Sequence, residues 1–371
     1  MRPADLLATA AVLVALLQVT PLAAQARGVA SAGRAQSEPG CRHQVLSQRP
    51  GWTASGAWEG GNLLLVDTLA ATGKLLRYSV SGNALAGALP LGIPKTLGAA
   101  APSRIATQGD KLVVQVGASR FVNLGPGRSF SSATDASWYN LPADGSTIDK
   151  VLTWAPAGND IIGFAEVKSP GERWSSGVVR FPQQDSQTFR YLKNLSTLSA
   201  SRKFHRLGYQ YTAAIGSTGY VLLMEEGGFR LYRSAPPSDD LKEMKALGRW
   251  SVPELPNFTQ PEDYAAVMGV VEESAMPVGL YAWGKDLYLL SRQPAGSSTE
   301  WRLSRIDVER DRIVETTVIP SRAHHLFAVP GPDQWAFVEK GAARGLREQD
   351  VETVLLVPST RIQHPNAILC Q

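Results

Sequence analysis

Long apolar runs are almost absent from this sequence. The one exception, Leu6 to Val19, spans about 14 residues, which is short of the roughly 20 that a membrane-spanning helix needs. It follows Met1-Arg2 and precedes Ala24-Gln25-Ala26, which together give the n-region, h-region and A-x-A pattern of a secretory signal. We therefore expect residues 1–26 to be a signal peptide, no transmembrane segment after its removal, and a periplasmic or extracellular location.

Cysteine is nearly absent too, because the chain contains two, Cys41 and Cys370. In an exported protein we expect these two to form a disulfide, with two free thiols as the alternative. The pair would enclose about 330 residues, for which a loop-entropy treatment gives roughly 5 to 6 kcal/mol as an upper bound. A disulfide would also bring the two ends of the domain to within about 7 Å between Cα atoms. A closed, circular architecture meets that condition.

Neither sign of charge dominates. The chain has 37 Lys and Arg against 33 Asp and Glu, and it contains no run of five or six like charges. We therefore expect no nucleic-acid partner. Residues 27–40 are rich in Ala, Gly, Ser and Arg without periodicity, and we interpret them as a flexible leader. The folded domain is then expected to cover 41–371.

Catalytic sequence motifs are missing as well. The chain has no G-x-S-x-G, H-E-x-x-H or G-x-G-x-x-G motif, no Walker loop and no complete calcium loop. This absence removes the usual evidence for an enzyme. It does not exclude one, because some repeat folds assemble a site from several repeats around an axis.

What the sequence does contain is a repeat. Each unit has an apolar run, a glycine-centred turn, a second apolar run, and a third run in which apolar and polar residues alternate, as in Phe229 to Arg233. The intervals between successive turn glycines are 48, 49, 58, 68 and 47 residues. The glycines are Gly61, Gly109, Gly158, Gly216, Gly284 and Gly331.

Three to four strands per unit, at a period of about 50 residues, predict the blades of a β-propeller. We expect an all-β fold with six blades, or seven as the alternative. Between Ser251 and Met276 the pattern changes, and Pro261-Glu262-Asp263 precedes apolar residues at helical spacing. This predicts a short helical insertion near 259–273.

The stretch from Gly61 to Asp67, followed by Gly73 to Tyr78, resembles a blade of the six-bladed NHL-type or TolB-like propellers. It is also similar to the opening blade of gluconolactonase-like propellers, in which a Glu-Gly-Pro before the first strand supplies a metal ligand. Here Glu59-Gly60-Gly61 falls in a turn after Trp58, without convincing Asn and Asp partners. We therefore expect no metal site of that kind and no bound cofactor.

A repeated Pro-Ser-Arg precedes two predicted innermost strands and ends at Arg104 and Arg322. Together with Lys150 and His324, these arginines are predicted to form a basic ring at the channel mouth, which would hold an anion. The alternative is that neighbouring carboxylates neutralise the ring and join blades. Because adjacent strand residues face opposite sides, one of His324 and His325 can reach the channel, so a metal site would need ligands from other blades.

The leading hypothesis is an exported, non-catalytic propeller that binds a protein, peptide or glycan at one face. The alternative is a metal- or quinone-dependent propeller enzyme, either a gluconolactonase-like hydrolase or a quinoprotein dehydrogenase. A third hypothesis is a purely structural envelope protein. Whether the chain is catalytic is not decided by the sequence.

Overall fold

The computed structural model describes most of the chain from residue 40 onward. The described residues are 40–46, 55–67, 74–81, 84–91, 102–108, 111–118, 120–124, 136–139, 142–143, 146–169, 173–182, 190–194, 209–225, 228–238, 240–248, 250, 264–295, 298–340 and 351–370. The expected signal peptide and, apart from Gly40, the expected leader lie outside these residues, so both stay predictions.

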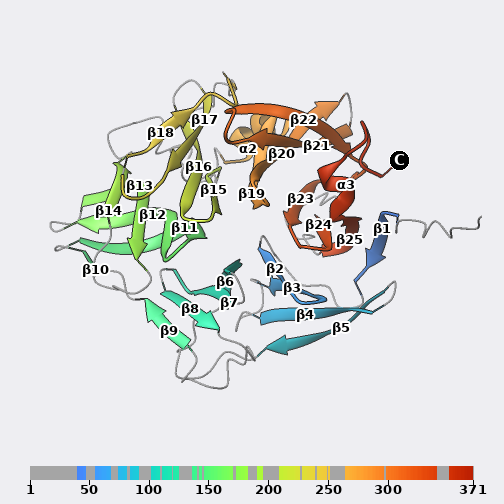
Figure 1. Ribbon diagram of the computed structural model, residues 1–371, viewed down its shortest axis with the longest axis horizontal. Helices are drawn as coiled ribbons and strands as arrows, with labels where there is room; N and C mark the ends of the chain where they lie inside the picture. Colours follow the sequence, from blue (N-terminus) through green and yellow to red (C-terminus); the bar gives the residue numbers. More distant parts are fainter. Residues whose placement is uncertain are drawn as a thin grey trace, which may run out of the picture. The chain divides into compact units, whose positions relative to one another are not determined.

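The described strands form six antiparallel sheets arranged around a central axis, so the chain is a six-bladed β-propeller (Figure 1). Blade 1 contains β2 (Gly56–Glu59), β3 (Asn62–Asp67), β4 (Lys74–Ser81) and β5 (Ala84–Leu91). Blade 2 contains β6 (Pro102–Gln108), β7 (Lys111–Val116), β8 (Arg120–Leu124) and β9 (Ala136–Tyr139). Blade 3 contains β10 (Pro142–Ala143), β11 (Ser146–Ala157), β12 (Asp160–Ser169), β13 (Arg173–Pro182) and β14 (Arg190–Asn194).

The second half of the ring repeats this plan. Blade 4 contains β15 (Tyr211–Ile215), β16 (Thr218–Glu225), β17 (Gly228–Ser234) and β18 (Lys242–Met244). Blade 5 contains β19 (Met276–Trp283), β20 (Asp286–Ala295), β21 (Ser298–Asp307) and β22 (Arg312–Ile319). Blade 6 contains β23 (His325–Val329), β24 (Gln334–Lys340), β25 (Val351–Pro358) and, as its outermost strand, β1 (Arg42–Val45).

The ring closes by joining the two ends of the described chain within blade 6. Strand β1 pairs antiparallel with β25, and Arg42 lies opposite Leu356. Just before β1, Cys41 forms a disulfide with Cys370, with 5.6 Å between the Cα atoms. The predicted disulfide and the predicted closed architecture are therefore confirmed.

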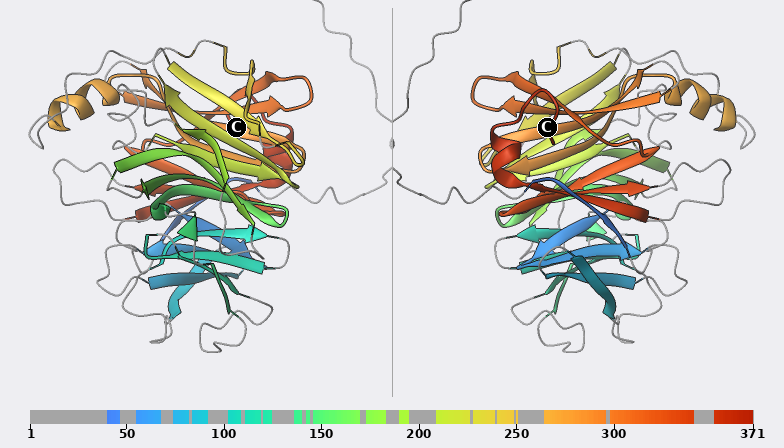
Figure 2. Two further views of the ribbon diagram at one scale, coloured as in Figure 1. Left: turned by 90° about the vertical axis from the view of Figure 1, so that its left-hand side faces the viewer. Right: turned by 90° about the vertical axis from the view of Figure 1, so that its right-hand side faces the viewer.

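The disulfide also joins blade 6 to blade 5. After the short helix α3 (Ser359–Gln363), the chain runs beside β22, where Ile368 makes a parallel bridge with Val318. The N–H of Leu369 donates to the carbonyl of Val318 at 2.9 Å. Cys370 therefore holds the outermost strand of one blade next to that of its neighbour, and Figure 2 shows the blue and red ends of the chain together.

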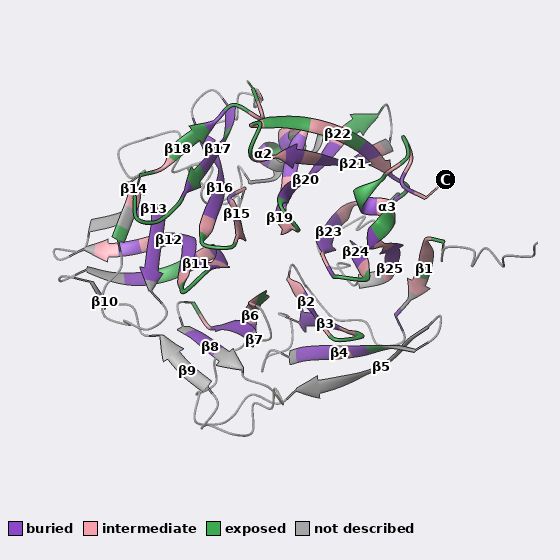
Figure 3. Cartoon of the chain, in the orientation of Figure 1, coloured by how far each residue is buried: buried purple, intermediate pink, exposed green. Residues whose placement is uncertain are grey.

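Burial follows the position of each strand in its blade. The four central residues of β3 are buried, whereas β22 on the outside of blade 5 is largely accessible (Figure 3). The third strand β17 is mostly buried but exposes Arg230 and Arg233, and because two buried residues separate them the predicted alternation is not strict. This arrangement is expected when both faces of an inner strand are covered by neighbouring blades and those of an outer strand are not.

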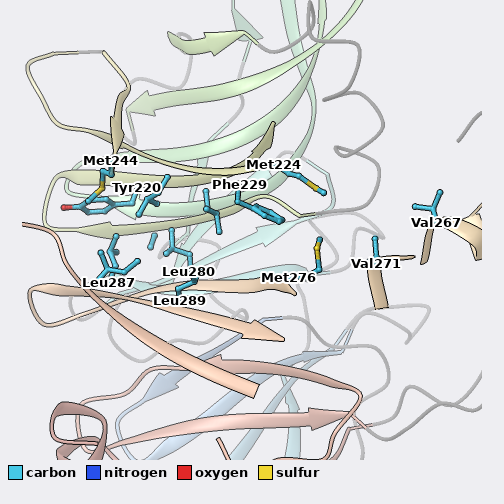
Figure 4. Packing of buried hydrophobic residues seen from close by; sticks show 14 residues of the cluster. Tyr220, Met224, Phe229, Met244, Val267, Val271, Met276, Leu280, Leu287 and Leu289 are labelled. Carbon is cyan, nitrogen blue, oxygen red and sulfur yellow. The ribbon is translucent and has the colours of Figure 1, made fainter. Parts of the chain in front are cut away.

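Apolar side chains fill the space between adjacent blades. Between blades 4 and 5, Leu222, Leu231, Leu287 and Leu289 belong to one fully buried cluster (Figure 4). Helix α2 (Tyr264–Glu272) extends this cluster with Val267 and Val271, which confirms the helical insertion predicted near 259–273. Neither of the two described helices has the length and apolar character needed to cross a membrane.

Candidate functional site

A cavity of about 450 Å³ lies along the propeller axis and is lined by residues from the innermost strand of every blade. This volume falls within the roughly 300–1,000 Å³ typical of small-molecule sites. Because the innermost strands β2, β6, β11, β15, β19 and β23 run side by side around the axis, they all begin at one face and end at the other. The cavity can therefore be described by two ends.

Positively charged side chains lie at the end where the innermost strands begin. Arg104 is the third residue of β6, and His325 is the first residue of β23. The β-sheet register places two more cations at this end, because Arg292 pairs with Met276 at the start of β19 and Lys340 pairs with His325. The four basic side chains among the described lining residues, Arg104, Arg292, His325 and Lys340, thus come from one end.

Arg292 is more deeply buried than Arg104, with 5% of its surface exposed. One Nη2–H donates to the carbonyl oxygen of Val271, in the last turn of α2, at 2.8 Å. Its buried Nε–H has no hydrogen-bond partner within the part of the chain that the structure describes. A buried donor without a partner costs about 1–3 kcal/mol, and more for a charged group, so this arginine is held in place at an energetic cost.

Arg104 reaches across the channel from blade 2. Burial lowers the pKa of Arg104. Electrostatic interactions with Tyr211 in blade 4 and Tyr281 in blade 5 raise it by a smaller amount. Among the described residues, no carboxylate forms an ion pair with it. The guanidinium is therefore surrounded by neutral hydroxyls rather than by acids.

Tyr281 is held in place by its own blade and the next one. Its hydroxyl accepts a hydrogen bond from the N–H of Ala328 at 2.9 Å, and burial raises the pKa of Tyr281 to about 12. The ring lies over Gly279, where an added Cβ would come within 2.6 Å of the ring carbon that carries the hydroxyl. Gly279 is thus required by the close approach of this tyrosine.

Lys340 and His325 both lie where a positive charge is unfavourable. Burial lowers the pKa of Lys340 to about 8. The pKa of His325 is lowered to about 4, first by burial and then by the nearby charges of His324, Lys340 and Arg292. Lys340 also places its Nζ 5.7 Å from the centre of the Phe327 ring.

No Asp or Glu is among the described residues that line the cavity. Two buried acids do end second strands at the same face, but each is bound elsewhere. Glu225 accepts hydrogen bonds from Lys193 and Tyr232, and Glu339 accepts one from Thr353. These two acids are therefore bound to other side chains, and neither lines the cavity.

The predicted basic ring is only partly brought together. Arg104 lines the cavity, whereas Lys150 and Arg322 are exposed and do not line it. His324 packs edge-on against His325 with 4.6 Å between ring centres, and His325 is the one of the two that lines the cavity. The ligand role of the predicted ring stays a prediction.

The sequence analysis missed Arg292, Lys340 and the tyrosines. A signal for the two cations was present, because each follows the apolar run of a second strand, eight residues after Gly284 and nine after Gly331. In an antiparallel blade the end of the second strand lies beside the start of the first. A residue there faces the same mouth as the start of the innermost strand.

The described residues do not contain a cluster of three or more His, Cys, Asp or Glu side chains that could hold a metal ion. Glu59, at the position of interest in the gluconolactonase-like comparison, ends β2 and forms an ion pair with Arg77 at 3.2 Å. It therefore sits at the opposite end of the channel from the cations and is engaged in the sheet.

Comparison with solved structures shows the same architecture at low identity. A member of the DUF4221 family from Bacteroides vulgatus aligns with a TM-score of 0.50 and 9% identity, covering 85% of this chain and 96% of that one. A luciferin-regenerating enzyme aligns with a TM-score of 0.47 and 10% identity, covering 85% and 95%. No family model matches the chain, and no curated protein matches it by sequence. The similarity establishes the fold, and the NHL-type or TolB-like resemblance stays a prediction.

Titration of Lys340 is expected to appear in the pH dependence of stability. Its pKa is about 8 in the folded chain and about 10.5 when unfolded, so the unfolded state binds more protons between these values. Raising the pH from 7 to 10 should therefore stabilise the wild type relative to Lys340→Met, by about 1–3 kcal/mol. Denaturant titrations of both proteins at several pH values measure this difference. If the difference in unfolding free energy between the two proteins did not change with pH, the pKa of Lys340 would not be lowered in the folded chain.

Proposed function

We propose that this chain is an exported, non-catalytic propeller that binds a protein, peptide or glycan at the face where its innermost strands begin. In this proposal an acidic group of the ligand enters the cavity between Arg104, Arg292 and Lys340. The observation that carries the proposal is a cavity with cations at one end and no described acid in its lining. The export part rests on the sequence pattern of residues 1–26 and agrees with the disulfide.

The physical argument is one of charge compensation. Holding positive charge in this partly desolvated space is unfavourable, because burial lowers the pKa of Lys340, and burial followed by nearby charges lowers that of His325. An oxyanion would reverse this cost and accept charge-assisted hydrogen bonds, which are shorter and stronger than neutral ones. The guanidinium of Arg104, which lines the cavity, is one donor group that such an anion could use.

A sulfate titration tests the proposal. Melting of the mature protein should be followed in sodium sulfate and in sodium chloride of equal ionic strength, because binding to the folded state raises stability with ligand concentration. Arg104→Gln is the variant of choice, since no described hydrogen bond of Arg104 would be lost with the charge. We expect it to weaken sulfate binding by about 10-fold or more, as for the loss of a charged hydrogen bond.

Lys150→Gln and Arg322→Gln are the matched controls, because both remove an exposed cation outside the cavity. Both should respond to sulfate like the wild type, which also cancels the general stabilisation that sulfate gives to folded proteins. An equal response of Arg104→Gln and the wild type would contradict the proposal. A loss confined to Arg322→Gln would instead place the anion at the predicted outer ring.

The metal-dependent alternative has no support in the donor groups that line this cavity, since Arg104, Arg292 and Lys340 would repel a cation. The quinone-dependent alternative stays a prediction. A visible absorbance spectrum of the purified protein distinguishes it from the binding role.

A further inference from the structure

The axial cavity has a marked difference in polarity between its two ends. Beyond the cations, toward the turns that end the innermost strands, the cavity is lined by small apolar side chains. Ala106 of blade 2, Ala214 of blade 4 and Ala282 of blade 5 all line this part, and all three keep partial accessibility. None of the charged residues that line the cavity lies in this half.

The middle of the cavity is polar but already satisfied. Thr153 and Thr212, from blades 3 and 4, lie with their hydroxyl oxygens 3.0 Å apart and hydrogen-bond to each other. In the alanine-lined half, an ionic ligand that extended past the cations would meet no charge, and the hydroxyl of Thr107 would be a polar side chain there. One hydroxyl replaces little of the hydration that an ion loses, so a charged group is unfavourable in this half.

The apolar half is also long enough to accept part of a ligand. From Val278, near the cations, to Ala282, β19 advances four residues, or about 13 Å at roughly 3.3 Å per residue. Because alanine is the smallest residue with a side chain, these positions leave space at the axis rather than filling it. An apolar chain placed there would be removed from water, at about 0.8 kcal/mol per buried CH₂.

We infer that the group entering this cavity is an amphipathic acid, with a carboxylate between Arg104, Arg292 and Lys340 and an unbranched aliphatic chain along the alanine-lined half. This inference rests on the proposed function, since it assumes that the cations hold an anion. It narrows the acidic group of that ligand from any oxyanion to a carboxylate on an unbranched aliphatic chain. Its distinguishing consequence is that affinity depends on the length of the chain as well as on the charge.

Binding of a homologous series of acids tests the inference. We expect affinity for the mature protein, measured by calorimetry, to rise about three- to fourfold for each added CH₂ from butanoate to octanoate. Octylammonium, which has the same chain and the opposite charge, should not bind. If octylammonium bound as well as octanoate, the carboxylate would not be recognised and the inference would be overturned.

Two variants locate the chain within the cavity. Ala214→Leu and Ala282→Leu should each reduce octanoate binding to near that of butanoate while leaving sulfate binding unchanged, because they fill the apolar half alone. Ala118→Leu is the matched control, since Ala118 is exposed in the turn between β7 and β8. Its octanoate affinity should equal that of the wild type, and a melting curve for each variant confirms that it is folded.

The outcomes separate this inference from the proposed function. If sulfate binds through Arg104 but affinity does not change from butanoate to octanoate, the inference is overturned and the oxyanion site stands. If neither sulfate nor any acid of the series binds, both are overturned. If octanoate binds and the two alanine variants bind it equally well, the chain lies elsewhere and the inference is again overturned.

Discussion

Replacing both Cys41 and Cys370 with serine is expected to lower the free energy of unfolding by about 3–5 kcal/mol. The disulfide joins residues separated by 329 positions, so its loss restores a large conformational entropy to the unfolded chain. In the folded chain it also holds the start of β1 against the segment that bridges to β22. Urea unfolding of the double variant and the oxidised wild type, followed by circular dichroism, measures the difference.

The reducing agent dithiothreitol supplies the control for this experiment. It should lower the stability of the wild type to that of the double variant and should not affect the variant itself. Equal stability of variant and oxidised wild type would mean that β1 and its pairing with β25 close the ring without help. The disulfide would then have no measurable role in closing the propeller.

A single methyl group at Gly331 is expected to destabilise the fold by about 2–3 kcal/mol, as overpacking of a closely packed site does. Gly331 lies in the turn after β23, where an added Cβ would be 2.5 Å from a ring carbon of Trp58. Trp58 belongs to blade 1 and donates from its indole Nε1–H to the carbonyl oxygen of Val329 in blade 6 at 2.9 Å. Gly331→Ala would therefore push apart the two blades that meet where the ring closes.

Gly61→Ala is the matched control, because Gly61 is the corresponding turn glycine of blade 1. Nothing lies within 4 Å of a Cβ built on it, so the stability should change by no more than about 0.5 kcal/mol. Denaturant unfolding of the two variants compares them directly. An equal loss of unfolding free energy in the two variants would show that close packing against Trp58 does not require a glycine at position 331.

The repeat made the fold predictable from the sequence. Five of the six predicted turn glycines lie between the first and second strands of a blade, and Gly109 lies outside the described residues. In four of these turns the left-handed conformation is taken by a glycine, such as Gly158 and Gly284 with φ of 64° and 61°. In the first blade that conformation belongs to Gly60 rather than to the predicted Gly61. Turn chemistry and strand periodicity are local properties, which is why they could be read without knowing the contacts.

The candidate site was less accessible to sequence reasoning. The two Pro-Ser-Arg repeats do not occupy equivalent positions, because Arg104 lies five residues before its turn glycine and Arg322 lies nine before Gly331. Arg322 therefore precedes β23, whereas Arg104 is inside β6. Lys150 lies in β11 next to a register shift, and its side chain is exposed. A tripeptide match ignores the distance to the turn, and that distance decides which side chain reaches the axis.

Arg292 and Lys340 required knowledge of strand pairing across a blade. Their approach to the axis depends on the register with Met276 and His325, which is a non-local property. Burial of such cations is also unusual, since Lys and Arg are almost never fully buried unless they are paired. Residue type alone therefore predicts that Arg292 and Lys340 lie on the surface. In the proposed function, an acidic group of the ligand lies beside these two side chains.

A crystal structure of the mature protein soaked in sodium selenate tests the central claim most directly. Selenium scatters anomalously, so its position can be found without assuming where an anion binds. We expect an anomalous peak in the axial cavity, with a selenate oxygen about 2.7–2.9 Å from a guanidinium nitrogen of Arg104. An empty cavity, with selenate at the exposed Arg322 or Lys150 instead, would contradict the assignment of the cavity as the ligand site.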